Sequence, residues 1–586
     1  MRGAAVDRAH GPARGCGLRR RLARGAQRPR RRIPRGSLRA LRDPEGRGPR
    51  GGAVPRASRR GARAALVSVF SPWVLLGVAL AGDPRRPPRA RSLRPCAARR
   101  ARRAGRAGAG RRVLPGRRGR RVKGRRVVVW GLGVFGGGAA AARVLAERGA
   151  RVRVLDRKPP SALAPSLRAL EGSEVELVLG REHRAEDFAG ADLVVKSPAI
   201  PPRSPWIAWL EERRVPLTSE LALGLAELET PYAVVTGSKG KSTTATLLGE
   251  MVREAFGSAE TVGNNERPLL ELVASRRRPA RVVVEVSSFM AEGLARARVA
   301  GARFRAPEVC VFTSLGPEHL DWHGGLEDYY EAKLSLLGLG PRAVASPAGS
   351  EELEARLPGR LGSARWLRSG REQGAGLAVE WTGEEARSAA GALLFRRGEL
   401  SLLGEHNLEN ALVAASGALA LGVAPEAVRR AVRAFRPLPH RLETVAVSPQ
   451  GIRFVNDSMA TTPAAAKAAL AAVEGPLVVL LGGSDKGARY EELAEAAAGV
   501  HSVVCLGEIG GALARALRAA VAARGGGAEV VHVRGGFEEA FRAGLERCPP
   551  GGALLLAPAT ASYDMFPNFK ARGERFRALA VEAARP

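Results

Sequence analysis

The stretch VVTGSKGKSTTATLLGEM, residues 234–251, decides the fold because it sets a glycine-rich turn between a strand and a helix. Val234 and Val235 end a run of residues typical of a strand, and the apolar residues after the turn recur at helical spacing. Glycines let backbone N–H groups curl round a polyphosphate, and the start of the helix adds a favourable dipole. The stretch therefore predicts a phosphate-binding loop in an α/β protein.

The candidate phosphate ligands are the consecutive residues of this turn: Gly237, Ser238, Lys239, Gly240, Lys241, Ser242 and Thr243. Lys241 is placed to neutralise phosphate charge, and Ser242 or Thr243 is placed to bind a magnesium ion. Val235 stands where the common G-x-x-x-x-G-K-[ST] pattern has glycine, so this loop is shorter than usual. An ordinary strand-to-helix connection is the alternative, and the two lysines followed by Ser-Thr favour nucleotide binding.

The positive charge of the chain is concentrated at one end. Residues 1–121 contain 36 Arg, no Lys and four acidic residues, in a chain of 586 residues with a formal charge of +37. The remaining residues are nearly balanced in charge, so we expect no nucleic-acid partner for them. The Arg-, Ala-, Gly- and Pro-rich leader predicts a disordered segment, because it has too little apolar surface to offset its chain entropy.

An apolar run at residues 64–82 interrupts the leader, with Pro72 and Trp73 inside it. A membrane helix needs about 20 apolar residues, so this run is at most a marginal span, and we expect no membrane partner. The other interpretation is that the leader is GC-rich DNA read upstream of the true start, because it carries Arg without Lys. Val122 is then the candidate start, since an internal GTG codon is listed as Val.

The cysteines give no sign of a metal or disulfide framework. Cys16, Cys96, Cys310, Cys505 and Cys548 lie far apart, and none belongs to a C-x-x-C pair. Together with the lack of a clear export signal, this predicts a cytoplasmic protein.

A second glycine-rich turn follows the strand-like run RRVVVWG, which starts at residue 125. Gly131, Gly133 and Gly136 form a G-x-G-x-x-G pattern, and Asp156 follows where a dinucleotide fold places its ribose-binding acid. A dinucleotide-dependent dehydrogenase is therefore one hypothesis. The same turn also suits other nucleotides, or only close packing of a helix against a strand.

Apolar runs alternate with helical patterns along the rest of the chain, which predicts an α/β protein with mostly parallel sheets. The region after the leader is long enough for about three domains. We place boundaries before the phosphate loop and at the two prolines of FRPLPHR. The predicted domains are 122–228, Rossmann-like; 229–437, a central phosphate-loop ATPase; and 438–586, doubly wound; they follow the leader 1–121.

Nine stretches together resemble one family, the Mur ligases, and within it the MurD type, from about residue 125 to the C-terminus. They are TGSKGKST (236–243), GNNERP (263–268), VEVSSF (284–289), PEHLDWHGGLEDYYEAK (317–333), GEHNLENAL (404–412), LPHRLE (438–443), NDSMATTP (456–463), GGSDKG (482–487) and APATASYDMFPNFKARG (557–573). Each stretch alone is weakly specific, and their shared order makes the resemblance specific.

The resemblance implies an ATP-dependent ligase that adds glutamate to UDP-N-acetylmuramoyl-L-alanine in peptidoglycan synthesis, and so serves cell-wall biogenesis, cell shape and cell division. ATP would phosphorylate the alanine carboxylate, the glutamate nitrogen would attack the acyl phosphate, and a tetrahedral intermediate would collapse to an amide. Two magnesium ions would offset the negative charge that gathers there. The expected state is a monomer.

The resemblance also assigns roles near the metals. Glu285 ends a strand and is expected to bind the first metal, with a helix-capping role as its alternative. His319 and Lys333 match the positions at the second metal, where Lys333 would be carbamylated. Without the family pattern, Lys333 is a helix-face lysine and His319 a loop histidine. His323 is a further candidate nearby.

Four other residues match nucleotide or substrate contacts of the family. Asn264 matches an asparagine that contacts the substrate, and Asn407 one beside the adenine. Arg441 and Asp457 match residues that hold the phosphate and the ribose of ATP after a hinge.

In the first domain the resemblance implies that Gly131 and Gly133 contact the UDP pyrophosphate and that Asp156 lies on the uracil side. The glycine pattern then no longer supports the dehydrogenase hypothesis.

The glutamate contacts implied by the resemblance are Thr461, Lys486, Ser562 and Phe569. Met459 departs from the family, because D-glutamate enzymes commonly carry lysine there in N-D-S-K-A-T. We predict D-glutamate, and L-glutamate is the alternative. Other Mur ligases and folylpolyglutamate ligases share the phosphate loop, but the SSF, NDSMAT and FPNFKARG stretches argue against them.

Overall fold

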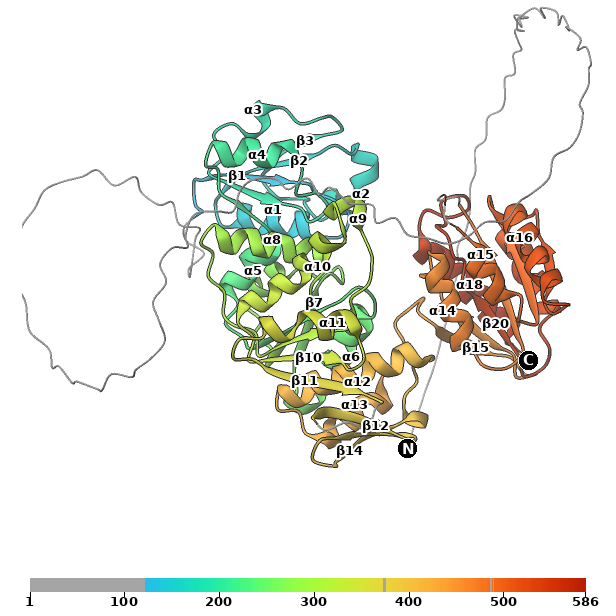
Figure 1. Ribbon diagram of the computed structural model, residues 1–586. Coiled ribbons are helices and arrows are strands. Elements are labelled where there is room, and N and C mark those ends of the chain that lie inside the picture. Colours follow the sequence, from blue (N-terminus) through green and yellow to red (C-terminus); the bar gives the residue numbers. More distant parts are fainter. Residues whose placement is uncertain (1–121, 372–375, 485–486, 488, 586) are drawn as a thin grey trace, which may run out of the picture. The chain divides into compact units, whose positions relative to one another are not determined.

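The computed structural model describes residues 122–371, 376–484, 487 and 489–585. Over this range the chain forms three successive α/β units, each built on its own sheet (Figure 1). The predicted α/β class with mostly parallel sheets is confirmed. The leader, its apolar run and Lys486 lie outside the described residues, so what the sequence indicates for them remains a prediction.

The first unit has a five-stranded parallel sheet in the order β3-β2-β1-β4-β5. Its strands are β1 (Arg126–Trp130), β2 (Arg151–Asp156), β3 (Val175–Leu179), β4 (Leu193–Lys196) and β5 (Leu217–Thr218). Its helices are α1 (Gly137–Glu147), η1 (Pro160–Leu163), α2 (Ala164–Arg168), α3 (Ala185–Phe188), α4 (Pro205–Glu212) and α5 (Glu220–Glu227). The strand order reverses beside β1, and in such sheets ligands bind where it reverses.

The central unit has a nine-stranded sheet in the order β14-β13-β12-β11-β10-β9-β6-β8-β7, in which only the β12-β13 and β13-β14 pairs are antiparallel. Its strands are β6 (Tyr232–Thr236), β7 (Ala259–Gly263), β8 (Arg281–Glu285), β9 (Val309–Phe312), β10 (Ala343–Pro347), β11 (Arg365–Gly370), β12 (Leu377–Thr382), β13 (Glu385–Ser388) and β14 (Leu393–Arg396). Its helices are α6 (Lys241–Phe256), α7 (Leu269–Ala274), α8 (Ser288–Val299), α9 (Leu320–His323), α10 (Leu326–Leu334), η2 (Ser335–Leu339), α11 (Glu351–Arg356), η3 (Pro358–Arg360), η4 (Arg397–Glu399), α12 (Glu405–Ala420) and α13 (Pro425–Ala434).

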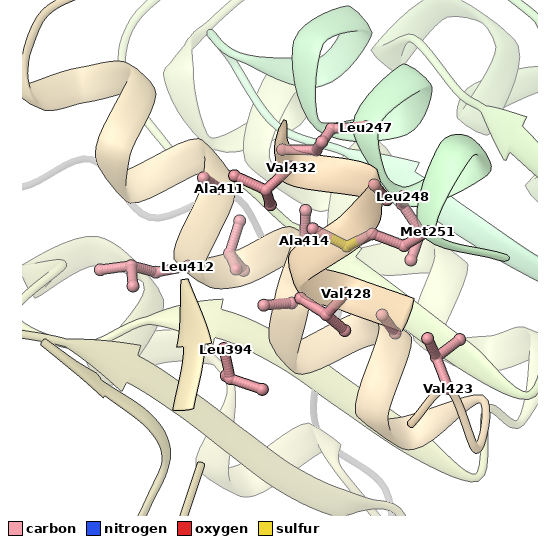
Figure 2. Packing of buried hydrophobic residues seen from close by; sticks show 14 of the residues in the cluster. Leu247, Leu248, Met251, Leu394, Ala411, Leu412, Ala414, Val423, Val428 and Val432 are labelled. Carbon is pink, nitrogen blue, oxygen red and sulfur yellow. The ribbon is translucent and has the colours of Figure 1, made fainter. Parts of the chain in front are cut away.

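The central strands are buried on both faces, which explains their nearly continuous apolar sequences. Val235 packs into the cluster under α6, α12 and α13, whereas its neighbour Val234 packs into the cluster under α8 and α10. Figure 2 shows the first cluster, where Leu248 and Met251 of α6 meet Ala414 of α12. Burying one such large side chain contributes about 1.5–3 kcal/mol, so this packing fixes α6 behind the phosphate loop.

The third unit has a six-stranded sheet in the order β15-β16-β20-β17-β18-β19, parallel except for β15 at one edge. Its strands are β15 (Glu443–Val447), β16 (Arg453–Asn456), β17 (Leu477–Gly482), β18 (Ser502–Leu506), β19 (Glu529–His532) and β20 (Ala553–Leu556). Its helices are α14 (Pro463–Ala472), α15 (Glu491–Ala497), α16 (Gly510–Ala523), α17 (Phe537–Glu546) and α18 (Phe569–Ala583). Because β16, β17 and β20 are parallel neighbours, the loops that follow them share one edge of the sheet.

Within the described part of the chain, every helix is too short or too polar to cross a lipid bilayer.

Candidate active site

Two glycines shape the phosphate loop between β6 and α6. Gly237 and Gly240 have φ angles of 147° and 81°, a region that side chains other than glycine rarely adopt. A Cβ atom at Gly237 would collide with Thr313 Oγ1, and one at Gly240 would collide with Asn410 Oδ1. The loop therefore needs glycine at both positions for two independent reasons, its backbone conformation and its close neighbours.

Ser238 forms hydrogen bonds that connect this loop to the segment that follows β9. Its hydroxyl donates to the Gly316 carbonyl at 2.8 Å and accepts from the Gly316 N–H at 2.9 Å. The buried Tyr329 hydroxyl also donates to Ser238 Oγ, at 2.8 Å. Because the Ser238 side chain is engaged with the protein, we expect its contribution to phosphate binding to come from its backbone N–H.

Two lysines converge on one carbonyl of the loop. Lys241 Nζ donates to the Gly237 and Ser238 carbonyls at 3.0 and 2.8 Å, and Lys333 Nζ donates to the same Gly237 carbonyl at 2.6 Å. Lys333 is 1% exposed, which rules out the solvated helix-face lysine of the sequence alternative. Burial, and to a smaller extent the Lys241 charge, lower the pKa of Lys333 to about 6. Burial also lowers the pKa of Lys241, while Glu285 and Glu318 oppose that shift.

Lys239 and His319 lie at the exposed edge of the loop. The Lys239 ammonium, 62% exposed, pairs with the Glu318 carboxylate. His319 is exposed, begins α9 with a φ of 53°, and packs its ring against Phe289 at a centroid distance of 4.8 Å. Partial burial lowers the pKa of His319, and the lysines of the site lower it further. Its imidazole is therefore favoured in the neutral form that binds metals.

Glu285 ends β8 with its carboxylate aimed at the phosphate loop. Its Oε1 accepts from Ser242 Oγ at 3.1 Å and from Asn264 Nδ2 at 2.9 Å. Its Oε2 is buried and has no hydrogen-bond partner among the described residues. The helix-capping alternative for Glu285 is wrong, because Ser287 caps α8 through the Met290 N–H.

Thr243 of α6 and Asn407 of α12 are both buried. Thr243 is buried on α6, and it is Ser242 that meets the Glu285 carboxylate. Asn407 donates to the Leu403 carbonyl at 2.8 Å and accepts from Asn410 Nδ2 at 3.2 Å. Asn407 therefore reaches the phosphate loop only through Asn410, whose Oδ1 sits against Gly240.

Arg441 stands between two residues with left-handed backbone. His440 and Leu442 have φ angles of 63° and 45°, which are costly for side chains of this size and occur mostly at functional sites. The Leu442 N–H donates to Asp457 Oδ1 at 3.3 Å, and Arg441 Nη2 donates to Ser242 Oγ at 3.3 Å. Burial raises the pKa of Asp457 to about 7. The guanidinium, the Ser242 hydroxyl and Glu285 are thus brought together.

Three family models match successive parts of the chain. The Mur ligase MurD-like N-terminal domain matches residues 125–219, the Mur ligase middle domain residues 235–418, and the Mur ligase glutamate ligase domain residues 440–560. The chain belongs to the Mur ligase family. Its relatives are ligases, so this Mur ligase is an ATP-dependent enzyme that forms an amide bond.

Full-length relatives agree with the family models. UDP-N-acetylmuramoylalanine–D-glutamate ligase of a Roseiflexus species is 37% identical over 469 residues, which cover 78% of this chain and 98% of the relative. UDP-N-acetylmuramoyl-L-alanine–L-glutamate ligase of Salinispora tropica is 35% identical, over 79% of this chain and 99% of the relative. The crystal structure of the UDP-N-acetylmuramate-alanine ligase MurC from Thermotoga maritima shares the fold, with a TM-score of 0.50 and 19% identity over 78% of this chain and 99% of that one.

The N-terminal loop of this Mur ligase has its predicted glycines at the end of β1. Gly131 and Gly133 have φ angles of 91° and 60°, and a Cβ atom at Gly131 would lie 2.7 Å from Ser197 Cβ, after β4. Asp156 accepts from the Gly133 and Lys158 N–H groups, each at 2.9 Å. Asp156 therefore shapes the glycine loop at the reversal of strand order.

The predicted glutamate contacts come from loops at one edge of the third sheet. Thr461 follows β16, Ser562 follows β20 and is buried, and Phe569 begins α18. Lys486 lies outside the described residues and is not placed. The three described residues thus belong to segments that the parallel sheet brings to the same edge.

The residues of this Mur ligase fit a magnesium ion beside Glu285. A buried carboxylate oxygen without a partner lies next to a hydroxyl, and such hard oxygen ligands are what magnesium prefers. In the described part of the chain, groups of three or more His, Cys, Asp or Glu side chains that could hold a metal do not occur. An ion held by Glu285 and Ser242 would therefore complete its shell with phosphate oxygens and water.

Sequence reasoning missed several residues that shape the site. Asn410 and Thr313 limit the two loop glycines, Tyr329 holds Ser238, and Glu318 pairs with Lys239. Asn410 and Glu318 belong to stretches that resemble the family, and this membership could have marked them as candidates. Their contacts could not be predicted, because each partner lies far away along the chain.

Proposed function

We propose that this chain joins glutamate to UDP-N-acetylmuramoyl-L-alanine, forming ADP, phosphate and an amide in peptidoglycan precursor synthesis. The observation that carries the proposal is the convergence of Lys241 and Lys333 on the Gly237 carbonyl, beside a carboxylate oxygen of Glu285 that has no partner. A site that gathers a cation, a buried lysine amine and a carboxylate with a free oxygen under a phosphate loop suits transfer of a phosphoryl group to a carboxylate.

Each group around the loop then has a defined task. The N–H groups of Gly237–Thr243 and the Lys241 ammonium hold the polyphosphate, and Arg441 moves from Ser242 to a phosphate oxygen. Asn407 faces the adenine side, and Asp457 holds the ribose. Asn264, now bonded to Glu285, turns to the substrate carboxylate. These roles follow the family pattern, and the hydrogen bonds of Lys241, Arg441 and Asn264 support them.

Magnesium would reduce the repulsion between the γ-phosphate and the incoming carboxylate. Ser242 and Glu285 would hold one ion, with Thr243 behind them, and His319 and Lys333 would serve the second. A lysine amine adds CO₂ only in its neutral form, and Lys333 is buried with no carboxylate paired to it among the described residues. We therefore propose that Lys333 is carbamylated, which converts a buried cation into an anion.

Glutamate would bind in the third unit through Thr461, Lys486, Ser562 and Phe569, with its nitrogen towards the acyl phosphate. We favour D-glutamate, as in the name of the Roseiflexus relative. L-glutamate is the second candidate, because Met459 replaces the usual lysine and a relative of similar identity is named for L-glutamate. A dehydrogenase or a folylpolyglutamate ligase has no comparable support. Because ATP and UDP-linked precursors occur inside the cell, the enzyme would act in the cytoplasm, and we expect a monomer.

The test gives the purified full-length protein UDP-N-acetylmuramoyl-L-alanine, ATP and magnesium with each glutamate enantiomer in turn. We expect ADP release and a product heavier by one glutamate residue with D-glutamate. Product with L-glutamate alone would overturn the assignment of D-glutamate and would still agree with the proposed ligase activity. No product with either enantiomer would overturn the proposed function.

A further inference from the structure

Arg572 is a buried cation with an unusual set of partners. It lies on α18, is 1% exposed, and donates hydrogen bonds only to uncharged oxygens. Nε donates to Ser458 Oγ at 3.0 Å and Nη1 to the Ala561 carbonyl at 3.3 Å. Nη2 donates to the Ser458 and Thr560 carbonyls at 2.9 and 3.2 Å. Among the described residues no carboxylate lies within ion-pair distance of its guanidinium.

These hydrogen bonds join three segments that carry predicted glutamate contacts. Ser458 stands three residues before Thr461, and Ala561 directly precedes Ser562. The Ser458 hydroxyl, which accepts from Arg572, donates to the Phe569 carbonyl at 2.8 Å. The Arg572 guanidinium and the Ser458 hydroxyl thus link the loop after β16, the loop after β20 and the start of α18.

The segment that leads to Lys486 packs against the same guanidinium. Gly483 has a φ of 141°, and a Cβ atom there would lie 3.4 Å from Arg572 Nη1 and would collide with the Ala561 carbonyl. Only glycine lets this segment approach so closely. Arg572 therefore lies where Gly483 meets the three described segments with predicted glutamate contacts.

Hydrogen-bonded dipoles satisfy the Arg572 guanidinium directly, and the Asp564 carboxylate favours its charge without an ion pair between the two side chains among the described contacts. A buried cation is costly to keep unless hydrogen bonds satisfy it, and an unpaired one attracts anions strongly through a medium of low polarity. Burial lowers the pKa of Arg572 to about 10, so the group stays charged at neutral pH. The substrate of the proposed reaction brings two carboxylates to this edge, and Met459 supplies no charge there.

We propose that Arg572 is a positioning residue for the amino-acid substrate, which holds the segments of Thr461, Ser562 and Phe569 together and supplies a buried positive charge behind them. This inference rests on the proposed function. Arg572 need not touch glutamate, because four of its five N–H groups already donate to Ser458, Thr560 and Ala561. Its effect is therefore confined to the second half of the reaction, after the acyl phosphate has formed.

The test uses the full chain in three variants. Arg572→Met removes the guanidinium and its charge, whereas Arg572→Lys removes the guanidinium and keeps a positive charge. Ser458→Ala keeps Arg572 and removes the hydroxyl that bridges it to Phe569. Arg575→Met is the matched control, since it changes an arginine of the same helix whose side chain is 43% exposed and paired with Glu538. Three quantities are measured: the melting temperature, the KM values for glutamate and ATP, and formation of hydroxamate from UDP-N-acetylmuramoyl-L-alanine, ATP and hydroxylamine without glutamate.

We expect Arg572→Met to raise the KM for glutamate by about 10-fold or more, with smaller rises for Arg572→Lys and Ser458→Ala. Hydroxamate formation and the KM for ATP should stay within about 2-fold of the wild type, as all values should in the control. If Arg572→Met fails to fold, the other two variants decide. An unchanged KM for glutamate in folded variants, or an equal loss of hydroxamate and product, would overturn the inference. Failure of the proposed function itself would appear in the wild type, as absence of hydroxamate and product.

Discussion

At the scale of single residues, the site is defined by two lysines that share one acceptor. Lys241 and Lys333 both donate to the Gly237 carbonyl, although α6 and α10 carry them from different parts of the chain. Two ammonium groups so close together repel each other, which favours loss of charge from the more enclosed one. We therefore expect Lys241 to be the cation for the nucleotide and Lys333 to be the amine that is available for modification.

Lys241→Ala should lower ATP turnover by about 10²-fold or more, because it removes the charge that stabilises the transferred phosphoryl group. The fold should persist, since α6 is held by its apolar face. ADP release and circular dichroism measure the two effects. Lys467→Ala, at a half-exposed lysine of α14, is the control and should change neither. Near-normal turnover in Lys241→Ala would refute the phosphate-loop assignment.

Lys333→Ala should also lose activity, and acetate or bicarbonate should restore part of it if a carbamate is needed. The shortened side chain leaves space in which a small carboxylate can supply the missing anion. Activity is measured with increasing acetate in the variant and in Lys241→Ala, which acetate should not rescue. An active Lys333→Ala without any additive would remove Lys333 from the site.

At the scale of elements, the connection between β6 and α6 shows which residues form the shortened glycine loop. The strand and the helix are fixed by burial on both faces of the sheet, and only the residues between them are free to vary. Val235, which departs from the common pattern, is a buried strand residue rather than part of the turn. The turn itself begins at Gly237.

Gly240→Ala should weaken ATP binding by at least about 10-fold, because the new methyl group would collide with Asn410 and force the loop to move. Gly257→Ala is the matched control: Gly257 ends the same helix with a φ of 76° and has open space around it. The control should lose about 1 kcal/mol of stability and keep its affinity for ATP. Calorimetric titration with an ATP analogue gives both affinities; equal affinities in the two variants would contradict the steric argument.

The ion pairs of Glu399 join η4 to α13 and should make stability depend on pH. Hydrogen bonds from Arg429 hold the pKa of Glu399 down at about 2. Because the folded pKa is below the ordinary value, the stabilisation is fully present above pH 4.5 or so and is lost as the pH falls towards 2. Glu399→Gln should therefore lower the melting temperature at pH 6, and the difference from wild type should shrink at pH 3. A constant difference would mean that charge is not involved.

At the scale of the whole molecule, the sequence was sufficient for the α/β class, for the glycine turn between β6 and α6 and for Glu285 at the end of its strand. These depend on local patterns, namely apolar runs, glycines and strand ends. The bond from Lys333 to Gly237, over 96 residues, and that from Arg572 to Ser458, over 114, could not be predicted, because only packing of the sheets brings those residues together. For the same reason the burial of Lys333 could not be read from its helix.

The most direct test of the proposed acyl-phosphate mechanism follows an oxygen atom through the reaction. UDP-N-acetylmuramoyl-L-alanine labelled with ¹⁸O in its carboxylate is incubated with the full-length protein, ATP, magnesium and the glutamate enantiomer that the enzyme uses. If the carboxylate attacks the γ-phosphate and the glutamate nitrogen then displaces phosphate, one ¹⁸O atom must leave in inorganic phosphate for each amide formed. We expect labelled phosphate to form only when both ATP and glutamate are present. Unlabelled phosphate, released by simple hydrolysis of ATP, would contradict it.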